Sequence, residues 1–229
     1  MKRLLFAAVL AVFFSGVCLA GEKPELADEN DRVSYSVGYQ IGGDFKRQGV
    51  DLNPEKLVKG IQDARSGAEL LMTRQEMHQA LVDLKKKIMA EERKQRREEA
   101  EKVRKEGEAF LAANRKKEGV VTLGSGLQYR VIQEGAGKSP KATDNVTVNY
   151  RGTLVDGTEF DSSYKRGQTV TFPVNGVIPG WTEALQKMKE GDKWQLFVPS
   201  SLAYGERGAG REIGPNATLL FEVELIAVK

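Results

Sequence analysis

The stretch NYRGTLVDGTEFDSS, residues 149–163, decides how the second half of the chain folds. Its first residues alternate apolar or β-branched side chains with polar ones, which is typical of a half-buried strand. Asp156 and Gly157 then predict a tight hairpin turn. Phe160 and Asp161 follow at once, so that an aromatic ring stands beside a carboxylate. This pair is typical of a pocket that is mostly apolar and holds one polar group.

The period of two continues on both sides of this stretch, from Val120 to the end of the chain. Strands are expected at 127–133, 145–154, 169–174, 193–199 and 217–228, and one short helix at 181–188. Five antiparallel strands with one helix packed against them form an α+β domain of ordinary size. We place this domain at residues 119–229.

The first half of the chain is predicted to be helical. A first helix is expected over 29–47, with Val33, Val37 and Ile41 on one stripe. Asn53 and Pro54 open a second helix, and Gly67 ends it. Two short amphipathic helices are a thin basis for an independent core. We therefore expect residues 21–72 to form a helical dimerisation domain that pairs with a second copy of the chain.

A long helix is expected to connect the two parts, at residues 73–118. Thr73 and Glu76 fit the capping box that opens a helix. A helix over 74–117 would be about 66 Å long at 1.5 Å per residue. Its early part has a seam of Met77, Leu81 and further apolar residues, but residues 85–118 hold 13 Lys or Arg against 8 Asp or Glu. Such a segment reads as a solvated spacer, and a nucleic-acid-binding arm is the alternative.

The first 20 residues have the layout of a secretory signal peptide. Lys2 and Arg3 precede the apolar run LLFAAVLAVFF, and small residues follow, with cleavage expected after Ala20. A membrane anchor is a second interpretation, but the run falls short of the roughly 20 residues that a span requires. A lipid on Cys18 is a third, which the branched Val17 disfavours. Export to the periplasm is expected, with association with the outer surface as an alternative.

The composition excludes several classes of function. The formal charge is +3, and removal of two cationic residues with the leader leaves +1, which gives little support for nucleic-acid binding. Cys18 is the only cysteine, so disulfides are not expected in the mature chain. His78 is the only histidine and fits an exposed helical position. Most histidine-based catalysis and most zinc sites are thereby excluded, and no metal is expected.

Three segments resemble the FKBP-type peptidyl-prolyl cis-trans isomerases in order and spacing. They are VNYRGTLVDGTEFDSS, VIPGWTEALQKMKEGDKWQLFVPSSLAYGERGAG and IGPNATLLFEVEL, and the resemblance covers residues 120–229. The front of the chain is similar to the helical dimerisation domain of the macrophage infectivity potentiator-like branch, through YSVGYQIGGDFK, LVKGIQDA and the long charged helix. The resemblance implies an antiparallel half-barrel sheet wrapped on the short helix, with an apolar pocket between them.

The same resemblance implies the residues of the site. The expected catalytic residues are Tyr150, Phe160, Asp161, Tyr204 and Phe221, and the expected substrate-binding residues are Arg166, Val170, Val177, Ile178, Trp181 and Ile213. Trp181 is expected at the floor of the pocket, and Arg166 is expected to pair with Asp161. Val170 stands where the best-known eukaryotic members carry an aromatic residue, and Ala209 where they often carry histidine. These departures bear on substrate preference and on macrolide affinity more than on activity.

Isomerisation of a prolyl bond requires no cofactor, and none is expected. The barrier of about 18–20 kcal/mol comes from amide resonance, and only Xaa-Pro bonds populate cis appreciably. A site that binds the twisted amide better than the planar one accelerates the exchange. The expected substrates are unfolded or proline-containing polypeptides of the envelope, and macrolides are candidate inhibitors. The competing hypothesis is a holding chaperone whose helices grip unfolded chains while the pocket only binds them.

Overall fold

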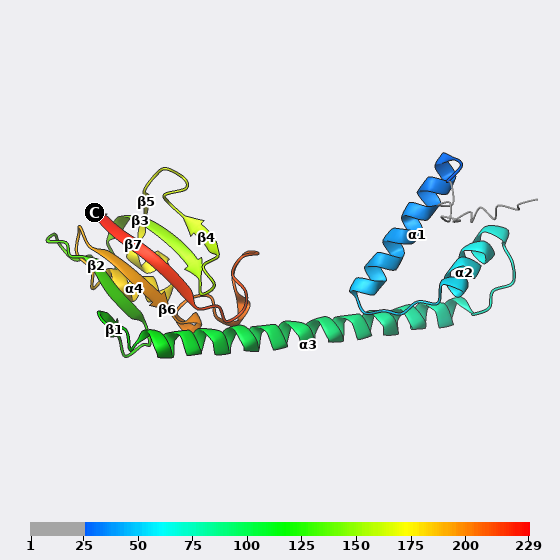
Figure 1. The fold of residues 1–229 in the computed structure, drawn as a ribbon, viewed down its shortest axis with the longest axis horizontal. Coiled ribbons are helices and arrows are strands. Elements are labelled where there is room, and N and C mark those ends of the chain that lie inside the picture. Colours follow the sequence, from blue (N-terminus) through cyan, green and yellow to red (C-terminus); the bar gives the residue numbers. More distant parts are fainter. Residues whose placement is uncertain (1–25) are drawn as a thin grey trace, which may run out of the picture. The chain divides into compact units, whose positions relative to one another are not determined.

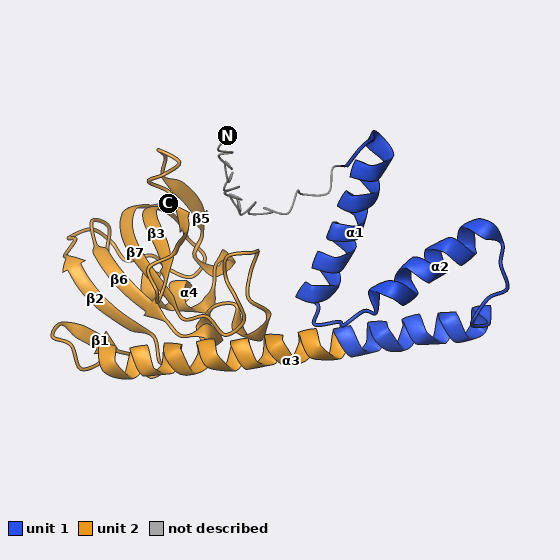
Figure 2. Cartoon of the chain, turned by 45° about the vertical axis from the view of Figure 1, so that its right-hand side comes forward, with its two compact units in different colours: residues 1–88 blue, residues 89–229 orange. Residues whose placement is uncertain are grey.

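The computed structural model describes residues 26–229, so the expected signal peptide lies outside the described residues. The chain divides into two compact units, residues 1–88 and 89–229 (Figure 2). Within the described part of the chain, no helix combines the length and the apolar character needed to cross a membrane.

Three helices make up most of the first half, as expected. They are α1 (Glu29–Arg47), α2 (Pro54–Ser66) and α3 (Arg74–Asn114), of which α3 begins in the first unit and ends in the second. The Asn53 side chain accepts the Lys56 N–H at 3.0 Å and caps α2. Gly67 ends that helix in the left-handed conformation that glycine adopts without strain. The capping box is confirmed: the Glu76 N–H donates to Thr73 Oγ1, and the Thr73 N–H donates to Glu76 Oε2.

The first unit leaves its apolar side chains largely uncovered. Neither α1 nor α2 buries an apolar residue, and the only buried residue of the two helices is Asp63. The exposed set is Leu26, Val33, Tyr35, Val37, Tyr39, Leu57, Val58, Ile61, Leu70, Leu71, Met72 and Leu81. The amphipathic stripes that the sequence predicts are present, but nothing in residues 26–88 covers them.

The second unit is built on one antiparallel sheet (Figure 1). Its strands are β1 (Val120–Thr122), β2 (Gln128–Gln133), β3 (Asn145–Leu154), β4 (Glu159–Ser162), β5 (Val170–Pro173), β6 (Lys193–Val198) and β7 (Leu219–Val228). They are paired in the order β1-β2-β6-β7-β3-β4, and β5 pairs with β3 beside this path. The two long strands, β3 and β7, pair from Val146–Val228 to Leu154–Leu219 and form the centre of the sheet.

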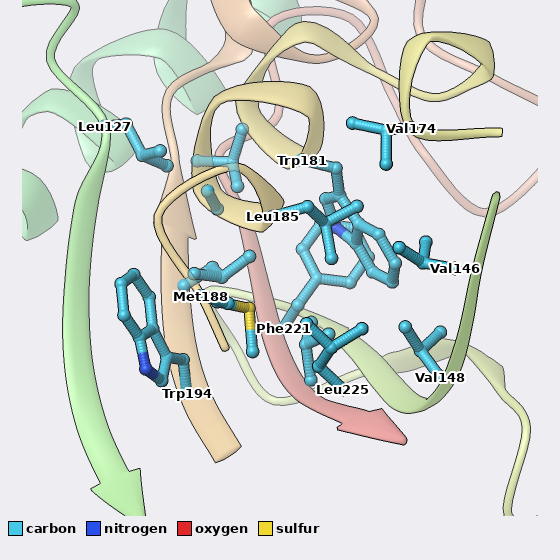
Figure 3. Close-up of a cluster of buried hydrophobic side chains, with 14 of the residues drawn as sticks. Leu127, Val146, Val148, Val174, Trp181, Leu185, Met188, Trp194, Phe221 and Leu225 are labelled. Atoms are coloured by element: carbon cyan, nitrogen blue, oxygen red, sulfur yellow. The ribbon is translucent and has the colours of Figure 1, made fainter. Parts of the chain in front are cut away.

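The core lies between the sheet and α4 (Pro179–Leu185). Along β7, Leu219, Phe221, Val223 and Leu225 alternate with more exposed residues, so that one face of the strand is buried. In the core, Trp181 and Leu185 from α4 face Phe221 and Leu225 from the sheet (Figure 3). Burial of each such side chain contributes about 1.5–3 kcal/mol, which is why the alternating pattern fixes the register.

The last turns of α3 cover the opposite face of the same sheet. Phe197 points away from the core yet is only 4% exposed, because the ring of Phe110 packs against it at 5.9 Å. The Gln128 side chain donates to Leu111 O and accepts from Asn114 Nδ2, both at 3.0 Å. The expectation that this part of the helix is a solvated spacer is therefore wrong for its final turns, which belong to the second unit.

Other differences from the sequence-based expectation are local. The expected five strands become seven, because the short β1 and β4 were not foreseen. Pro179 occupies the first turn of α4, so the helix begins two residues before the expected start and ends at Leu185. Helix α3 ends at Asn114, three residues before the expected end at 117.

Candidate active site

A cavity of about 450 Å³ opens between the sheet and the beginning of α4. Its lining comes from β3, β4, β5, β7, α4, the segment before α4 and the segment after β6. It consists of Tyr150, Phe160, Asp161, Val170, Phe172, Gly176, Val177, Ile178, Trp181, Tyr204 and Phe221. Most of these side chains are apolar, and a few polar groups stand among them. This composition is typical of a site for a small, largely apolar ligand.

The rings of the lining stack edge against face around Trp181. The centroid of Trp181 lies 5.3 Å from that of Tyr150 and 5.1 Å from that of Phe221, with interplanar angles of 88° and 85°. Phe160 meets Phe221 in the same way, at 5.6 Å and 87°. Edge-to-face contacts of this kind hold each ring in one orientation. The floor of the cavity is therefore a fixed aromatic surface.

Gly152 on β3 makes room for two of these rings. A Cβ at this position would lie 2.6 Å from ring atoms of Phe160 and 3.0 Å from the ring of Phe221. Gly152 is also the register partner of Phe221 on β7 and of Asp161 on β4. Because Gly152 has no side chain, the rings of Phe160 and Phe221 can both pack directly against β3.

One polar network stands at the edge of the cavity. The Tyr150 hydroxyl and the Arg166 guanidinium both donate to Asp161, and Arg166 also donates to the Tyr150 hydroxyl at 2.9 Å. Partial burial opposes ionisation of Asp161, but these two donors outweigh it and hold the pKa of the carboxyl below its usual value. Burial, and then the bond to Asp161, raise the pKa of Tyr150. The network thus contains an ionised carboxylate and a protonated phenol.

Two donors at the mouth of the cavity remain for a ligand, besides the buried indole N–H of Trp181, which has no partner in the described residues. Within residues 26–229 the backbone N–H of Ile178, just before α4, has no hydrogen-bond partner. Tyr204 is 42% exposed at the rim of the cavity, and its hydroxyl donates to no group in the same residues. The turn before Ile178 is held in place because the Thr182 hydroxyl donates to Val174 O at 2.8 Å. A carbonyl oxygen entering the cavity would meet these donors above the aromatic floor.

Nine of the eleven expected site residues line the cavity. Arg166 is not in the lining but reaches it through its bonds to Asp161 and Tyr150. Ile213 does not line the cavity: it packs against the core, and its backbone pairs with that of Ala209. Phe172 was missed, although it follows Val170 by two residues on β5 and so faces the same way. Its ring lies 5.6 Å from that of Trp181.

Another hollow of the described residues has a different character. It measures about 1030 Å³, runs along α3 and is lined by side chains of that one helix, eight of them charged, such as Arg93 and Glu98. No group of three or more His, Cys, Asp or Glu residues within 26–229 is arranged to hold a metal ion. The aromatic cavity is therefore the site to compare with known proteins.

Two protein families match the chain, one in each half. Residues 136–226 match the family described as FKBP-type peptidyl-prolyl cis-trans isomerase. Residues 30–131 match the family described as the domain amino terminal to FKBP-type peptidyl-prolyl isomerase.

Curated relatives and solved structures extend the match over nearly the whole chain. "Outer membrane protein MIP" of Legionella longbeachae is 47% identical over 99% of this chain and 97% of its own length. "Peptidyl-prolyl cis-trans isomerase Mip" of Coxiella burnetii is 44% identical over 100% of this chain and 99% of its own length. The crystal structure of FkpA from Escherichia coli covers 90% of this chain and 99% of its own, at 36% identity and a TM-score of 0.75. By sequence, fold and the makeup of its cavity, the chain belongs to the FKBP-type peptidyl-prolyl cis-trans isomerases and resembles the Mip branch along its full length.

Proposed function

We propose that this isomerase is exported, works as a homodimer, and accelerates prolyl isomerisation in unfolded polypeptides of the cell envelope. The observation that carries the proposal is the aromatic cavity with two unused donors at its mouth. A proline ring fits an apolar floor such as Trp181, and its preceding carbonyl needs a donor. The names of the relatives, one of them an outer membrane protein, and the expected leader at residues 1–20 support export.

The proposed roles follow from the geometry. Trp181 is the floor, and the Ile178 N–H and the Tyr204 hydroxyl hold the substrate carbonyl. Phe160, Phe221 and the other apolar side chains exclude water, which otherwise stabilises the planar, charge-separated amide. Asp161, fixed by its two donors, keeps the Tyr150 ring against the floor and places one negative charge beside the twisting bond. A rate gain of 10⁵ would require about 7 kcal/mol of preferential binding to the twisted amide.

The test is the cis-to-trans rate of an Xaa-Pro peptide with the full mature chain. We expect acceleration by the wild-type protein and a rise in KM of about fivefold for Tyr204→Phe, because one neutral hydrogen bond to the substrate is lost. Tyr164→Phe is the matched control, since the Tyr164 hydroxyl bonds Glu224 and does not line the cavity. Failure of the wild-type protein to accelerate the peptide would refute the proposal.

The homodimer is proposed from the uncovered surface of the first unit. Gly38, Ile41, Gly42 and Phe45 of α1 line a hollow of about 590 Å³ together with seven of the residues between 46 and 57. An added Cβ on Gly38 or Gly42 would meet nothing within 4 Å. Glycine inside a helix costs up to about 1 kcal/mol, and packing within the chain does not explain it here. Close approach of a second copy's helix would explain both the hollow and the glycines.

A holding-chaperone activity is a second proposed function, and the same uncovered side chains favour it. Two pockets joined by paired helices would also gain avidity for long unfolded clients. Asp161→Leu should remove isomerisation while it spares suppression of client aggregation, if the two activities reside in different units. Loss of both activities in a folded Asp161→Leu protein would contradict that division.

A further inference from the structure

Helix α3 contacts the loop that carries one side of the cavity rim. This loop, residues 205–218, follows Tyr204 and leads into β7. Its final residues meet α3 at two points: Asn216 lies against Ala100, and Thr218 lies against Gly107. All of these residues belong to the second unit.

Asn216 joins the two ends of the loop to the helix. Its backbone N–H donates to Gly205 O at 2.8 Å, so the end of the loop is tied to the residue after Tyr204. Its side-chain Nδ2 donates to Ala100 O at 3.3 Å on α3. Asn216 is also the only non-glycine residue of the described chain with positive φ, at 61°, a conformation that asparagine tolerates better than most residues. One residue thus connects the base of Tyr204 to the helix.

Gly107 sets how closely the helix approaches. It is buried, and a Cβ added to it would overlap the Thr218 hydroxyl and lie 3.1 Å from the Thr218 Cβ. Thr218 is only 5% exposed and directly precedes β7, so it has little room to withdraw. The lack of a side chain at Gly107 therefore lets the helix lie against Thr218.

We propose that Asn216 and Gly107 are positioning residues of the isomerase, which hold the Tyr204 hydroxyl at the cavity rim by fixing the 205–218 loop against α3. The inference rests on the proposed role of Tyr204 in holding the substrate carbonyl. It makes residues 100–114 of α3 a support of the active site, in addition to their place in the helix that continues into the first unit.

The test is a double-mutant cycle in the full-length mature protein, with kcat and KM for an Xaa-Pro peptide as the readout. Asn216→Gly tolerates the positive φ and removes the side-chain bond to Ala100, but it also makes the backbone more flexible. We expect KM to rise about fivefold with kcat within about twofold, since the lost contact acts on substrate binding. In a Tyr204→Phe background the same substitution should change KM by less than about twofold, because the hydroxyl that it positions is absent.

Two further variants separate positioning from a general loss of stability. Glu212→Gly adds the same flexibility at an exposed site of the loop and should leave KM unchanged. Asn216→Asp keeps the shape but cannot donate to Ala100 O, and should reproduce the rise in KM even if Asn216→Gly folds poorly.

The role of Gly107 is tested together with that of Thr218, the residue it contacts. Gly107→Ala should raise KM, and Thr218→Ala in the same chain should restore at least half of the loss by removing the overlapping hydroxyl. Equal effects of Asn216→Gly in the presence and absence of the Tyr204 hydroxyl, or no effect at all, would overturn the inference. Absence of any acceleration by the wild-type protein would instead refute the proposed function on which the inference rests.

Discussion

At the scale of single residues, the site depends on a carboxylate that is held by two donors. Asp161 accepts hydrogen bonds from Tyr150 and Arg166. The Arg166 cation balances its negative charge, and the two bonds hold the carboxylate in one orientation. Prolyl isomerisation needs neither a nucleophile nor a base, because no covalent bond forms or breaks. In the proposed mechanism the carboxylate keeps the Tyr150 ring against Trp181 and supplies one negative charge.

Asp161→Asn tests that role with little change of shape. The amide cannot be ionised, and one of its two polar ends donates where the carboxylate accepted, so Tyr150 and Arg166 compete for one oxygen. We expect kcat/KM to fall about tenfold, with the cavity still folded, in the peptide assay. Glu222→Gln is the control, because Glu222 pairs with Lys193 in a similar way and does not line the cavity. A loss of equal size in the control would argue against a specific role.

The pH dependence follows from the same network. The pKa of Asp161 is lowered from 3.8, so its interactions stabilise the fold above that value and are lost as the pH falls through the lower folded pKa. The pKa of Tyr150 is raised above 10. We therefore expect kcat/KM to stay flat from about pH 5 to pH 9 and to fall only below about pH 4. A titration with a midpoint near neutrality, measured with the same peptide, would show that another group takes part.

At the scale of elements, the sequence predicts the long features better than the short ones. The bounds of α1 and β3 agree with the expected ranges, since their caps and alternation are read directly from the residues. Strand β4 has four residues, too few to show a period, and forms because the Asp156-Gly157 turn folds Phe160 and Asp161 back onto β3. The pocket was placed by the resemblance to a family, because its residues are scattered over five elements.

The docking of α3 shows why contacts between elements are harder to predict. The docked face is Ala100, Val103, Gly107, Phe110 and Asn114, spaced three, four, three and four residues apart. That spacing is helical, but three of the five residues are small or polar and do not count as an apolar seam. Their burial follows from close approach and from hydrogen bonds to Gln128, which the pattern of one segment cannot reveal.

Phe110→Ala tests whether this face stabilises the second unit. The ring is partly buried against Phe197, so its removal should lower the free energy of unfolding by about 2 kcal/mol, less than the 3–5 kcal/mol of a fully buried ring. Denaturant unfolding of the full chain, followed by Trp181 and Trp194 fluorescence, measures the change. Glu106→Ala, on the exposed face of the same helix, should change it by less than about 0.5 kcal/mol. Equal free energies of unfolding for the two variants would mean that the contact between α3 and the sheet does not stabilise the second unit.

At the scale of the whole molecule, the second unit buries most of its large apolar side chains fully or in part, whereas the first unit exposes most of those in residues 26–88. The second unit buries 17 apolar residues in one core, whereas α1 and α2 bury none. A unit with so little core gains stability by association, and the expected partner is a second copy of the same helices. The pocket lies entirely in the other unit. Dimerisation should therefore affect the handling of large clients and leave the reaction on a short peptide unchanged.

Gly42→Ala tests whether the chain is a dimer or a monomer, because it should weaken association in a dimer but raise stability in a monomer. In a monomer, alanine in place of this helical glycine should raise the stability of the first unit by about 0.5–1 kcal/mol, since an added Cβ meets nothing there. In a dimer that packs closely at the hollow beside Gly38 and Phe45, the same methyl group should weaken association at least tenfold. Sedimentation at several concentrations measures this, with Gln95→Ala on the exposed face of α3 as the control.

Peptide isomerisation by Gly42→Ala should stay within about twofold of wild type, while suppression of client aggregation should fall as dimers dissociate. An unchanged association constant together with a more stable helix would show that the second copy does not cover this surface.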